Sequence, residues 1–251
     1  MKTHSRCRAG AILAAAVAVL LAAPASALAS TVYAAASLRE AFPALDGGQT
    51  YNFAGSNQLQ AQIERGAPAD VFAAASPTEP QALFDAGRCE RPVTFATNTL
   101  VLIVPRSNPA RISSVYDLRR GDPKRLAVGS PNVPIGDYTR KLLRRLSLTS
   151  VLRRNIVSNE ANVASVTSKV ALGSADAGFV YVTDARSVSD RVRTIRLPRY
   201  AQPPVRYRIC VVRRNGVDRA RAQGFIDKVV GQQGRRVLRR FGFGLPPRRP
   251  S

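Results

Sequence analysis

The amino-acid sequence predicts an α/β fold with mostly parallel sheets. Short apolar, β-branched segments alternate with helical patterns from residue 31 to residue 241, and this alternation is typical of strands joined by helices. Two early strands run directly into a small, serine-containing turn and then a helix. Because parallel strands place their carboxyl ends at one edge of a sheet, we expect a ligand site there.

The first 29 residues have the features of a secretory signal peptide. Lys2, Arg6 and Arg8 precede an apolar run from Ala9 to Ala23, and small residues with an A-x-A pattern follow at 27–29. The apolar run is short for a membrane span, and no later segment is apolar enough to cross a bilayer. We therefore expect an exported, soluble protein that begins near residue 30.

The first predicted strand ends at Ser37, and the second ends just before Ser56. Ser37 with Glu40 three residues later suits a helix start, and Gly55 before Ser56 allows close approach of the backbone to a ligand. Free N–H groups at a helix start attract an anion, so each turn is a candidate oxyanion site.

The other elements follow the same alternation. We expect further strands at 70–75, 99–105, 125–129, 175–182, 192–197 and 207–213. Helices are expected at 77–87, 115–120, 137–146, 159–172, 217–230 and 233–241.

The titratable residues argue against the commonest kinds of catalytic site. His4 is the only histidine and lies in the predicted signal peptide, so the mature chain has no Ser-His-Asp triad, Cys-His pair or histidine metal ligand. Cys89 and Cys210 remain, and the sequence leaves open whether they pair or are buried unpaired. We expect neither an enzyme nor a metal-cation site.

The formal charge of +22 falls to +19 when the three basic residues of the signal peptide are removed. The arginines occur in scattered pairs rather than in one arm interleaved with aromatics, so we interpret them as solvated helix faces, not as a nucleic-acid site. A polyanion-binding surface protein remains an alternative.

Several motifs, in order along the mature chain, resemble the molybdate-binding periplasmic proteins of ABC transporters, a solute-binding protein family. The residues that carry the resemblance are those at 33–38 (YAAASL), 53–56 (FAGS), 66–72 (GAPADVF), 126–129 (LAVG), 133–138 (VPIGDY), 162–163 (NV), 175–181 (ADAGFVY) and 241–243 (FGF).

The resemblance implies a two-lobed periplasmic-binding-protein fold of type II with a ligand cleft between the lobes. The chain would cross twice, giving lobe 1 at 30–102 and 207–245, lobe 2 at 103–206, and a disordered tail at 246–251. It also implies a periplasmic monomer that closes around its ligand and delivers it to an ABC permease.

The resemblance further implies that molybdate, and by the same token tungstate, is held without any charged side chain. Ser37 and Ser56 would supply hydroxyl and backbone N–H donors, Ile135 and Val163 backbone N–H donors, and Tyr181 its hydroxyl. Ile135 is bulkier than the alanine expected there, which would narrow the pocket.

Such a ring of donors leaves the proton of hydrogen phosphate without an acceptor and therefore rejects phosphate. Sulfate carries no such proton and would have to be excluded by its size. A binding protein for sulfate or an organic acid, and an exported enzyme that uses carboxylates, are the other functions that the sequence leaves open.

Overall fold

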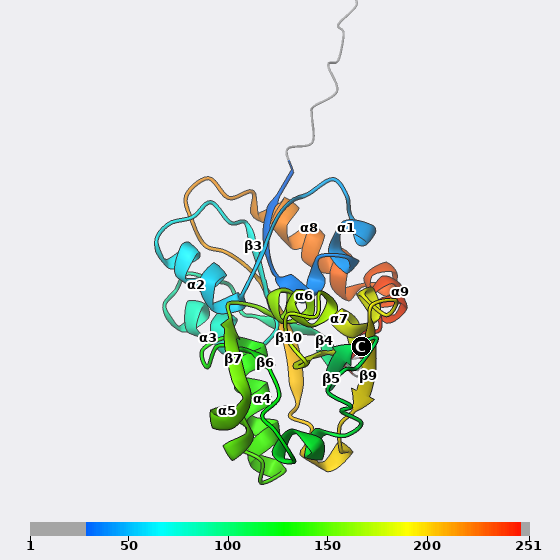
Figure 1. The fold of residues 1–251 in the computed structure, drawn as a ribbon. Helices are drawn as coiled ribbons and strands as arrows, with labels where there is room; N and C mark the ends of the chain where they lie inside the picture. Colours follow the sequence, from blue (N-terminus) through cyan, green and yellow to red (C-terminus); the bar gives the residue numbers. More distant parts are fainter. Residues whose placement is uncertain (1–28, 247–251) are drawn as a thin grey trace, which may run out of the picture.

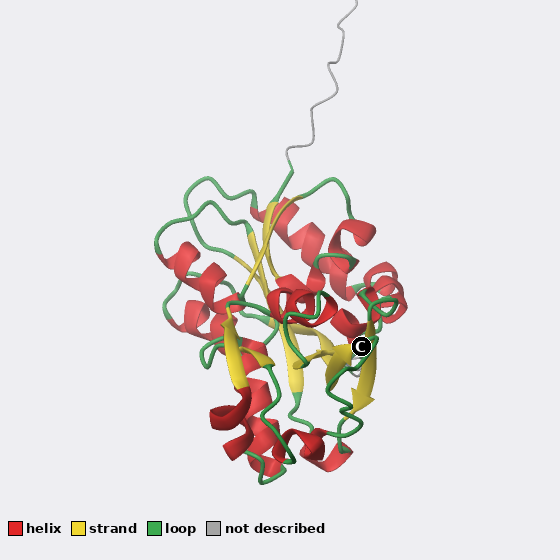
Figure 2. Cartoon of the chain, viewed as in Figure 1, coloured by secondary structure: helices red, strands yellow, loops and turns green. Residues whose placement is uncertain are grey.

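The computed structural model describes residues 29–246, which form two α/β domains, each built on a five-stranded mixed sheet (Figure 1). The predicted signal peptide and the tail therefore lie outside the described residues, apart from Ala29 and Pro246. Figure 2 shows the strands of both sheets enclosed by helices, as the predicted α/β class requires.

The first sheet has the strand order β2-β1-β3-β10-β4. Its strands are β1 (Thr31–Ala35), β2 (Thr50–Ala54), β3 (Val71–Ala74), β4 (Val93–Asn98) and β10 (Val205–Val211). β1 is parallel to β2 and β3, whereas β10 is antiparallel to both of its neighbours. Four of the five strands therefore share one direction.

The second sheet repeats this plan in the order β7-β6-β8-β5-β9. Its strands are β5 (Leu100–Pro105), β6 (Leu126–Gly129), β7 (Ile156–Glu160), β8 (Ala177–Tyr181) and β9 (Val192–Arg196). Here β5 is the single opposed strand, antiparallel to β8 and β9. The opposed strand of each sheet is the one that follows a crossing from the other sheet.

The two crossings lie close to the predicted lobe boundaries but not at them. Residues 100–102, which we assigned to lobe 1, belong to β5 and pair with the second sheet. β10 begins at Val205, two residues before the predicted boundary at 207. The sheets therefore change at Thr99 and again between Arg196 and Val205.

Helices cover both faces of the first sheet. They are α1 (Ala41–Leu45), α2 (Ser56–Glu64), α3 (Thr78–Asp85), α8 (Arg219–Val230) and α9 (Gln232–Arg240). α1, α8 and α9 share a core with Phe42 and Phe225 packed edge to face, while α2 and α3 bury Leu59 and Leu83 in a separate cluster. This apolar burial fixes the strand ends that lead into the site.

The second domain has the helices α4 (Pro134–Arg145), α5 (Ser150–Asn155), α6 (Val163–Ala171) and α7 (Val182–Ser187). Three short 3-10 turns, η1 (Ala36–Leu38), η2 (Val115–Arg119) and η3 (Arg199–Ala201), complete the chain. α6 packs on β8 and also touches η1 of the first domain, and it lies at mid-height in Figure 1, where the domains meet.

Some predicted elements were wrong in extent. The helix expected to start at Ser37 is instead the turn η1 followed by α1, because Pro43 has no N–H and is tolerated only in the first turn of a helix. The predicted helix at 159–172 begins at Val163, since the residues before it form β7. β4, β7, α5 and α7 were not predicted.

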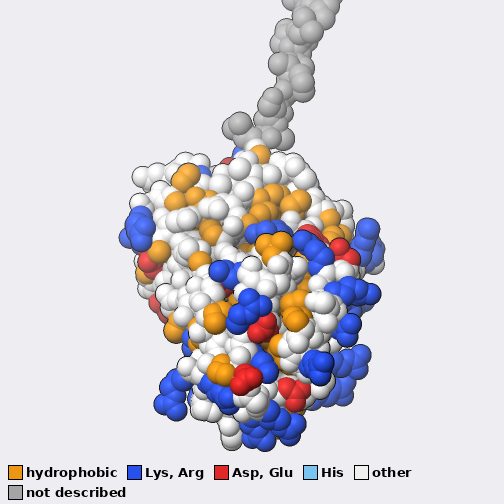
Figure 3. Space-filling view, viewed as in Figure 1, with side chains coloured by type: hydrophobic (Ala, Val, Ile, Leu, Met, Phe, Trp, Pro, Cys, Tyr) orange, Lys and Arg blue, Asp and Glu red, His pale blue; other side chains and the backbone are white. Residues whose placement is uncertain are grey.

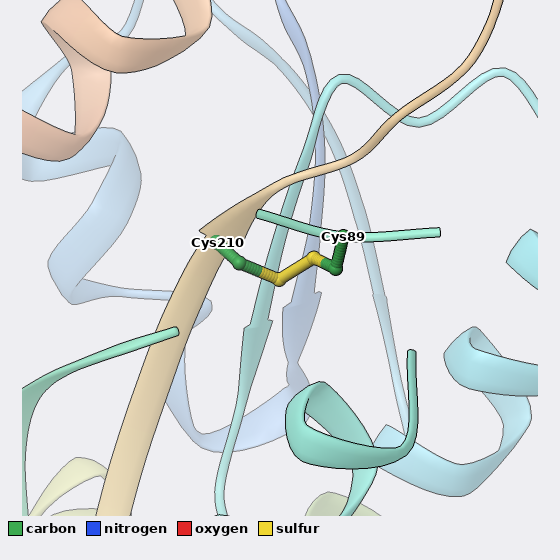
Figure 4. Close-up of a disulfide and its surroundings, with 2 residues drawn as sticks. All are labelled: Cys89 and Cys210. Carbon is green, nitrogen blue, oxygen red and sulfur yellow. A yellow bond between two sulfur atoms is a disulfide. The ribbon is translucent and has the colours of Figure 1, made fainter. Parts of the chain in front are cut away.

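Cys89 and Cys210 form a disulfide, which settles the alternative that the sequence left open (Figure 4). Cys210 lies on β10 and Cys89 lies on the chain before β4, where it bridges to Val212. Both are buried in the cluster with Leu59 and Leu83. The bond therefore ties the returning strand to the chain that leads to the first crossing.

The surface is strongly cationic. In Figure 3, lysine and arginine side chains are spread over the visible face and are numerous on the lower domain. Within residues 29–246, no helix combines the length and the apolar character that a bilayer crossing requires.

Candidate functional site

All five predicted site residues line one small cavity between the two domains. Ser37 and Ser56 come from the first domain, and Ile135, Val163 and Tyr181 come from the second. The cavity has a volume of about 20 Å³. Pockets for drug-sized ligands typically enclose about 300–1,000 Å³, so this site suits a very small ligand.

Each residue is positioned by the end of a strand or the start of a helix. Ser37 follows β1 and Ser56 follows β2 as the first residue of α2. Val163 is likewise the first residue of α6, whereas Tyr181 is the last residue of β8. The first N–H groups of α2 and α6 have no partner inside their helices, and the positive ends of the helix dipoles lie there.

The start of α4 is brought to the cavity by two glycines. A side chain on Gly136 would collide with the carbonyl oxygens of Gly129 and Ser130, and one on Gly129 would collide with Ile135. Only glycine permits this contact between β6 and α4. Pro134 at the first position of α4 suits a helix start, which is why the helix begins before the predicted residue 137.

The hydroxyl of Ser56 is oriented by the backbone. The N–H of Ala75 donates to Ser56 Oγ at 3.1 Å, and Ser56 is only 1% exposed. Because a backbone N–H can only donate, the serine oxygen is the acceptor and its proton remains available. Gly55, not Ser56, holds the cap position of α2, so the serine proton can point into the cavity.

The hydroxyl of Tyr181 has no hydrogen-bond partner among the described residues, although its side chain is only 1% exposed. Burial raises the pKa of Tyr181 well above its ordinary value, so the phenol keeps its proton at neutral pH. A buried, unpaired hydroxyl costs stability, and this one lies at the wall of the cavity.

Ser37 has a partner that the sequence did not predict. Its Oγ lies 2.9 Å from the hydroxyl of Tyr207, which in turn accepts from Asn98 Nδ2 at 3.3 Å. The hydroxyl of Ser37 therefore does not cap a helix, contrary to expectation. Tyr207 and Asn98 flank the crossings between the sheets, and no local sequence pattern links them to Ser37.

Among residues 29–246, no charged side chain lines the cavity. The remaining lining residues are small, apolar or uncharged: Ala35, Ala36, Ala54, Gly55, Ala75, Val133, Pro134 and Asn162. Asp137, one turn into α4, pairs with Lys141 at 2.6 Å on the exposed face of that helix. The hydrogen-bond donors that these residues offer are therefore neutral.

A larger hollow of about 210 Å³ adjoins the cavity and shares Ser37 with it. Arg39, Asp184 and Ala164 line this hollow, not the small cavity. Arg39 is exposed and donates to the carbonyl oxygen of Ala36. Across residues 29–246, the His, Cys, Asp and Glu side chains form no cluster that could hold a metal cation.

Comparison with known proteins places this site in a family context. A family model described as bacterial extracellular solute-binding protein matches residues 30–244. The chain is 39% identical over 225 residues to the molybdate-binding protein ModA of Mycobacterium tuberculosis, covering 86% of this chain and 84% of that protein. It is 30% identical over 236 residues to ModA of Escherichia coli, covering 86% and 88%.

Among solved structures, the periplasmic molybdate-binding protein of Azotobacter vinelandii superposes with a TM-score of 0.76. The match covers 87% of this chain and all of that chain (100%), at 23% sequence identity. At this level of identity the likeness establishes the two-domain fold alone.

Proposed function

Because the chain belongs to the family of bacterial extracellular solute-binding proteins, we propose that it captures molybdate between its two domains and delivers it to an ABC importer. The proposed ligand contacts are the hydroxyls of Ser37, Ser56 and Tyr181 and the backbone N–H groups of Ser37, Ser56, Ile135 and Val163. Tungstate, which has nearly the same size and charge, is proposed as a second ligand.

The observation that carries this proposal is a cavity at which three hydroxyls and three helix starts meet and which no charged side chain of residues 29–246 lines. Hydrogen bonds to a charged group contribute on the order of 1.5–3 kcal/mol each. Five to seven of them give a gross contribution of roughly 10–15 kcal/mol. Ordering and closure oppose this gain, which leaves an affinity between about micromolar and nanomolar.

The donors also favour a fully deprotonated oxyanion. The proton of Ser56 is free because its oxygen already accepts from Ala75, and the Tyr181 hydroxyl has a proton to donate. Hydrogen phosphate carries a proton that requires an acceptor, and these groups act as donors. Sulfate has no such proton, so its exclusion depends on the dimensions of the closed cavity.

We propose that the lobes follow the sheets. One lobe would comprise residues 30–98 and 205–245, and the other the segment between them, with closure about the two crossings. Members of this family act outside the cytoplasm. We further propose a periplasmic monomer, released from a cleaved signal peptide, whose partner is the membrane permease and which has no enzymatic activity and binds no nucleic acid.

Titration calorimetry of the mature protein tests the function directly. Molybdate, tungstate, sulfate and phosphate are titrated in the same buffer at neutral pH. Tight binding of molybdate and tungstate alone is the expected result. Equal affinity for sulfate would make the protein a general dianion carrier, and failure to bind molybdate would refute the proposal. Repetition at higher salt separates a specific site from polyanion attraction, which weakens steeply with salt.

A further inference from the structure

A buried chain of hydrogen bonds leads from the first crossing to Ser37. Asn98 is the last residue of β4, and Tyr207 lies near the start of β10. The two side chains meet at 3.3 Å, and Tyr207 continues to Ser37 at 2.9 Å. Tyr207 is 0% exposed, so water does not complete its hydrogen bonds.

The orientation of the Asn98 amide decides which group donates in each of these hydrogen bonds. The backbone N–H of Thr99 donates to Asn98 Oδ1 at 2.9 Å, which fixes the amide orientation because a backbone N–H can only donate. Nδ2 therefore faces the hydroxyls of Thr183, at 3.0 Å, and Tyr207. Asn98 is the donor in both contacts.

The hydroxyl of Tyr207 must then be the donor in its hydrogen bond to Ser37. Its oxygen already accepts from Asn98, and Ser37 Oγ is the other hydrogen-bond partner within the described residues. If Ser37 donated to Tyr207 instead, the buried phenol proton would have no acceptor, which carries a desolvation penalty. The favoured order is Asn98 to Tyr207 to Ser37, which leaves the serine proton to point into the cavity.

We propose that Asn98 and Tyr207 are specificity-determining positioning residues, which hold the Ser37 hydroxyl as a donor and prevent it from accepting a proton from the ligand. The inference rests on the proposed function of the same cavity. It adds to that function the residues that make Ser37 favour a deprotonated oxyanion over a protonated one. The backbone N–H of Ala75 makes Ser56 a donor toward the cavity in the same way, and no side-chain substitution removes that N–H. Ser37 is therefore the serine whose orientation can be changed by substituting its partner.

The substitution Tyr207→Phe tests the proposal. Without the phenol, Ser37 can rotate and accept a proton from hydrogen phosphate. Calorimetry with sodium molybdate and with inorganic phosphate at pH 8 should show molybdate binding weakened about fivefold to tenfold. Phosphate binding should become measurable, and the ratio of the two affinities should fall by at least about tenfold.

Tyr138→Phe is the matched control, because Tyr138 is also a buried tyrosine, its ring contacts Tyr181, and it does not line the cavity. Its ratio of affinities should equal that of the wild type.

Asn98→Asp is the second variant. A carboxylate accepts from Tyr207, so Ser37 donates to Tyr207 and presents a lone pair to the ligand, which also lowers the ratio. The added charge repels both dianions alike, so the ratio remains interpretable.

The outcomes separate the two proposals. If the wild type binds molybdate but Tyr207→Phe keeps the wild-type ratio, or if Tyr138→Phe changes the ratio as much, the role of Tyr207 is refuted and the proposed function stands. If the wild type does not bind molybdate, both are refuted. Thermal melting of each variant confirms that it is folded before its affinity is compared.

Discussion

Gly55, at the start of α2, lies directly against the carbonyl oxygen of Ala161, between β7 and α6. The two residues belong to different domains, and a methyl group on Gly55 would collide with that oxygen. The backbones of the two domains therefore meet beside the cavity at a position where only glycine fits.

We expect Gly55→Ala to weaken molybdate binding by about 10- to 100-fold, because overpacking typically costs about 1–3 kcal/mol and here opposes closure. Calorimetry measures the affinity, and small-angle scattering measures whether molybdate still compacts the protein. Gly224→Ala is the control, since a side chain there meets no atom and the residue lies in α8. Unchanged binding by Gly55→Ala would show that this contact is not part of the bound state.

Tyr181→Phe should separate stability from binding. The hydroxyl that it removes has no partner among the described residues, so the free energy of unfolding of the ligand-free protein should stay the same or rise. Molybdate affinity should fall by roughly 10- to 100-fold if the hydroxyl donates to the anion. Thermal melting with and without molybdate measures both effects. Tyr138→Phe also removes a buried hydroxyl that has no partner among the described residues, so it should have the same effect on stability but leave the affinity unchanged.

Ser56→Ala should affect both properties. The substitution leaves the buried N–H of Ala75 without its acceptor, which costs about 1–3 kcal/mol of stability, and it removes a proposed ligand donor. Denaturant unfolding and calorimetry measure the two losses. Ser174→Ala on the exposed surface provides the baseline. If Ser56→Ala bound molybdate with wild-type affinity, Ser56 would have a structural role only.

The carboxyl of Asp184 should make stability depend on pH. Burial raises the pKa of Asp184 to about 7, against about 3.9 in an unfolded chain. Between these values the folded protein keeps a proton that the unfolded chain has lost. The free energy of unfolding therefore falls as pH rises from about 4 to about 7.

Asp184→Asn should abolish this fall. Relative to the wild type, the variant should gain about 2–3 kcal/mol of stability between pH 5 and pH 8. Denaturant unfolding at both pH values measures the difference. Asp190→Asn, whose carboxyl is 79% exposed, should follow the wild type. If the free energies of unfolding of Asp184→Asn and the wild type differed by the same amount at both pH values, the raised pKa of Asp184 would be contradicted.

The sequence was sufficient to predict the residues around the cavity where the chemistry is local. Ser56 follows a predicted strand and starts a helix, so a short motif identifies it. Val163 lies inside the helix predicted at 159–172, and Tyr181 lies one residue before the end of the strand predicted at 175–182. The resemblance to a known family then assigned all five to one site. Their convergence on a single cavity is a property of the folded chain, which the structure supplies.

The hydrogen bond from Tyr207 to Ser37 joins residues that are distant in the sequence, so no local pattern predicts it. Tyr207 lies 170 residues from Ser37, and its surroundings read as an ordinary buried strand. The start of α1 could have been predicted, because Pro43 excludes a helix that begins at Ser37. β7 was not predicted: the helix predicted at 159–172 includes residues 159–160, and 156–158 were given no element, since the polar residues 158–160 do not resemble a strand.

The disulfide has a consequence for how the protein withstands proteases. Cys89 and Cys210 are 121 residues apart, and the whole second sheet lies in the loop that they close. A single peptide-bond cut anywhere in that loop leaves two polypeptides that are still covalently joined. A nicked molecule would migrate as one band on a gel until a reductant is added, and its first domain would keep both crossing strands attached.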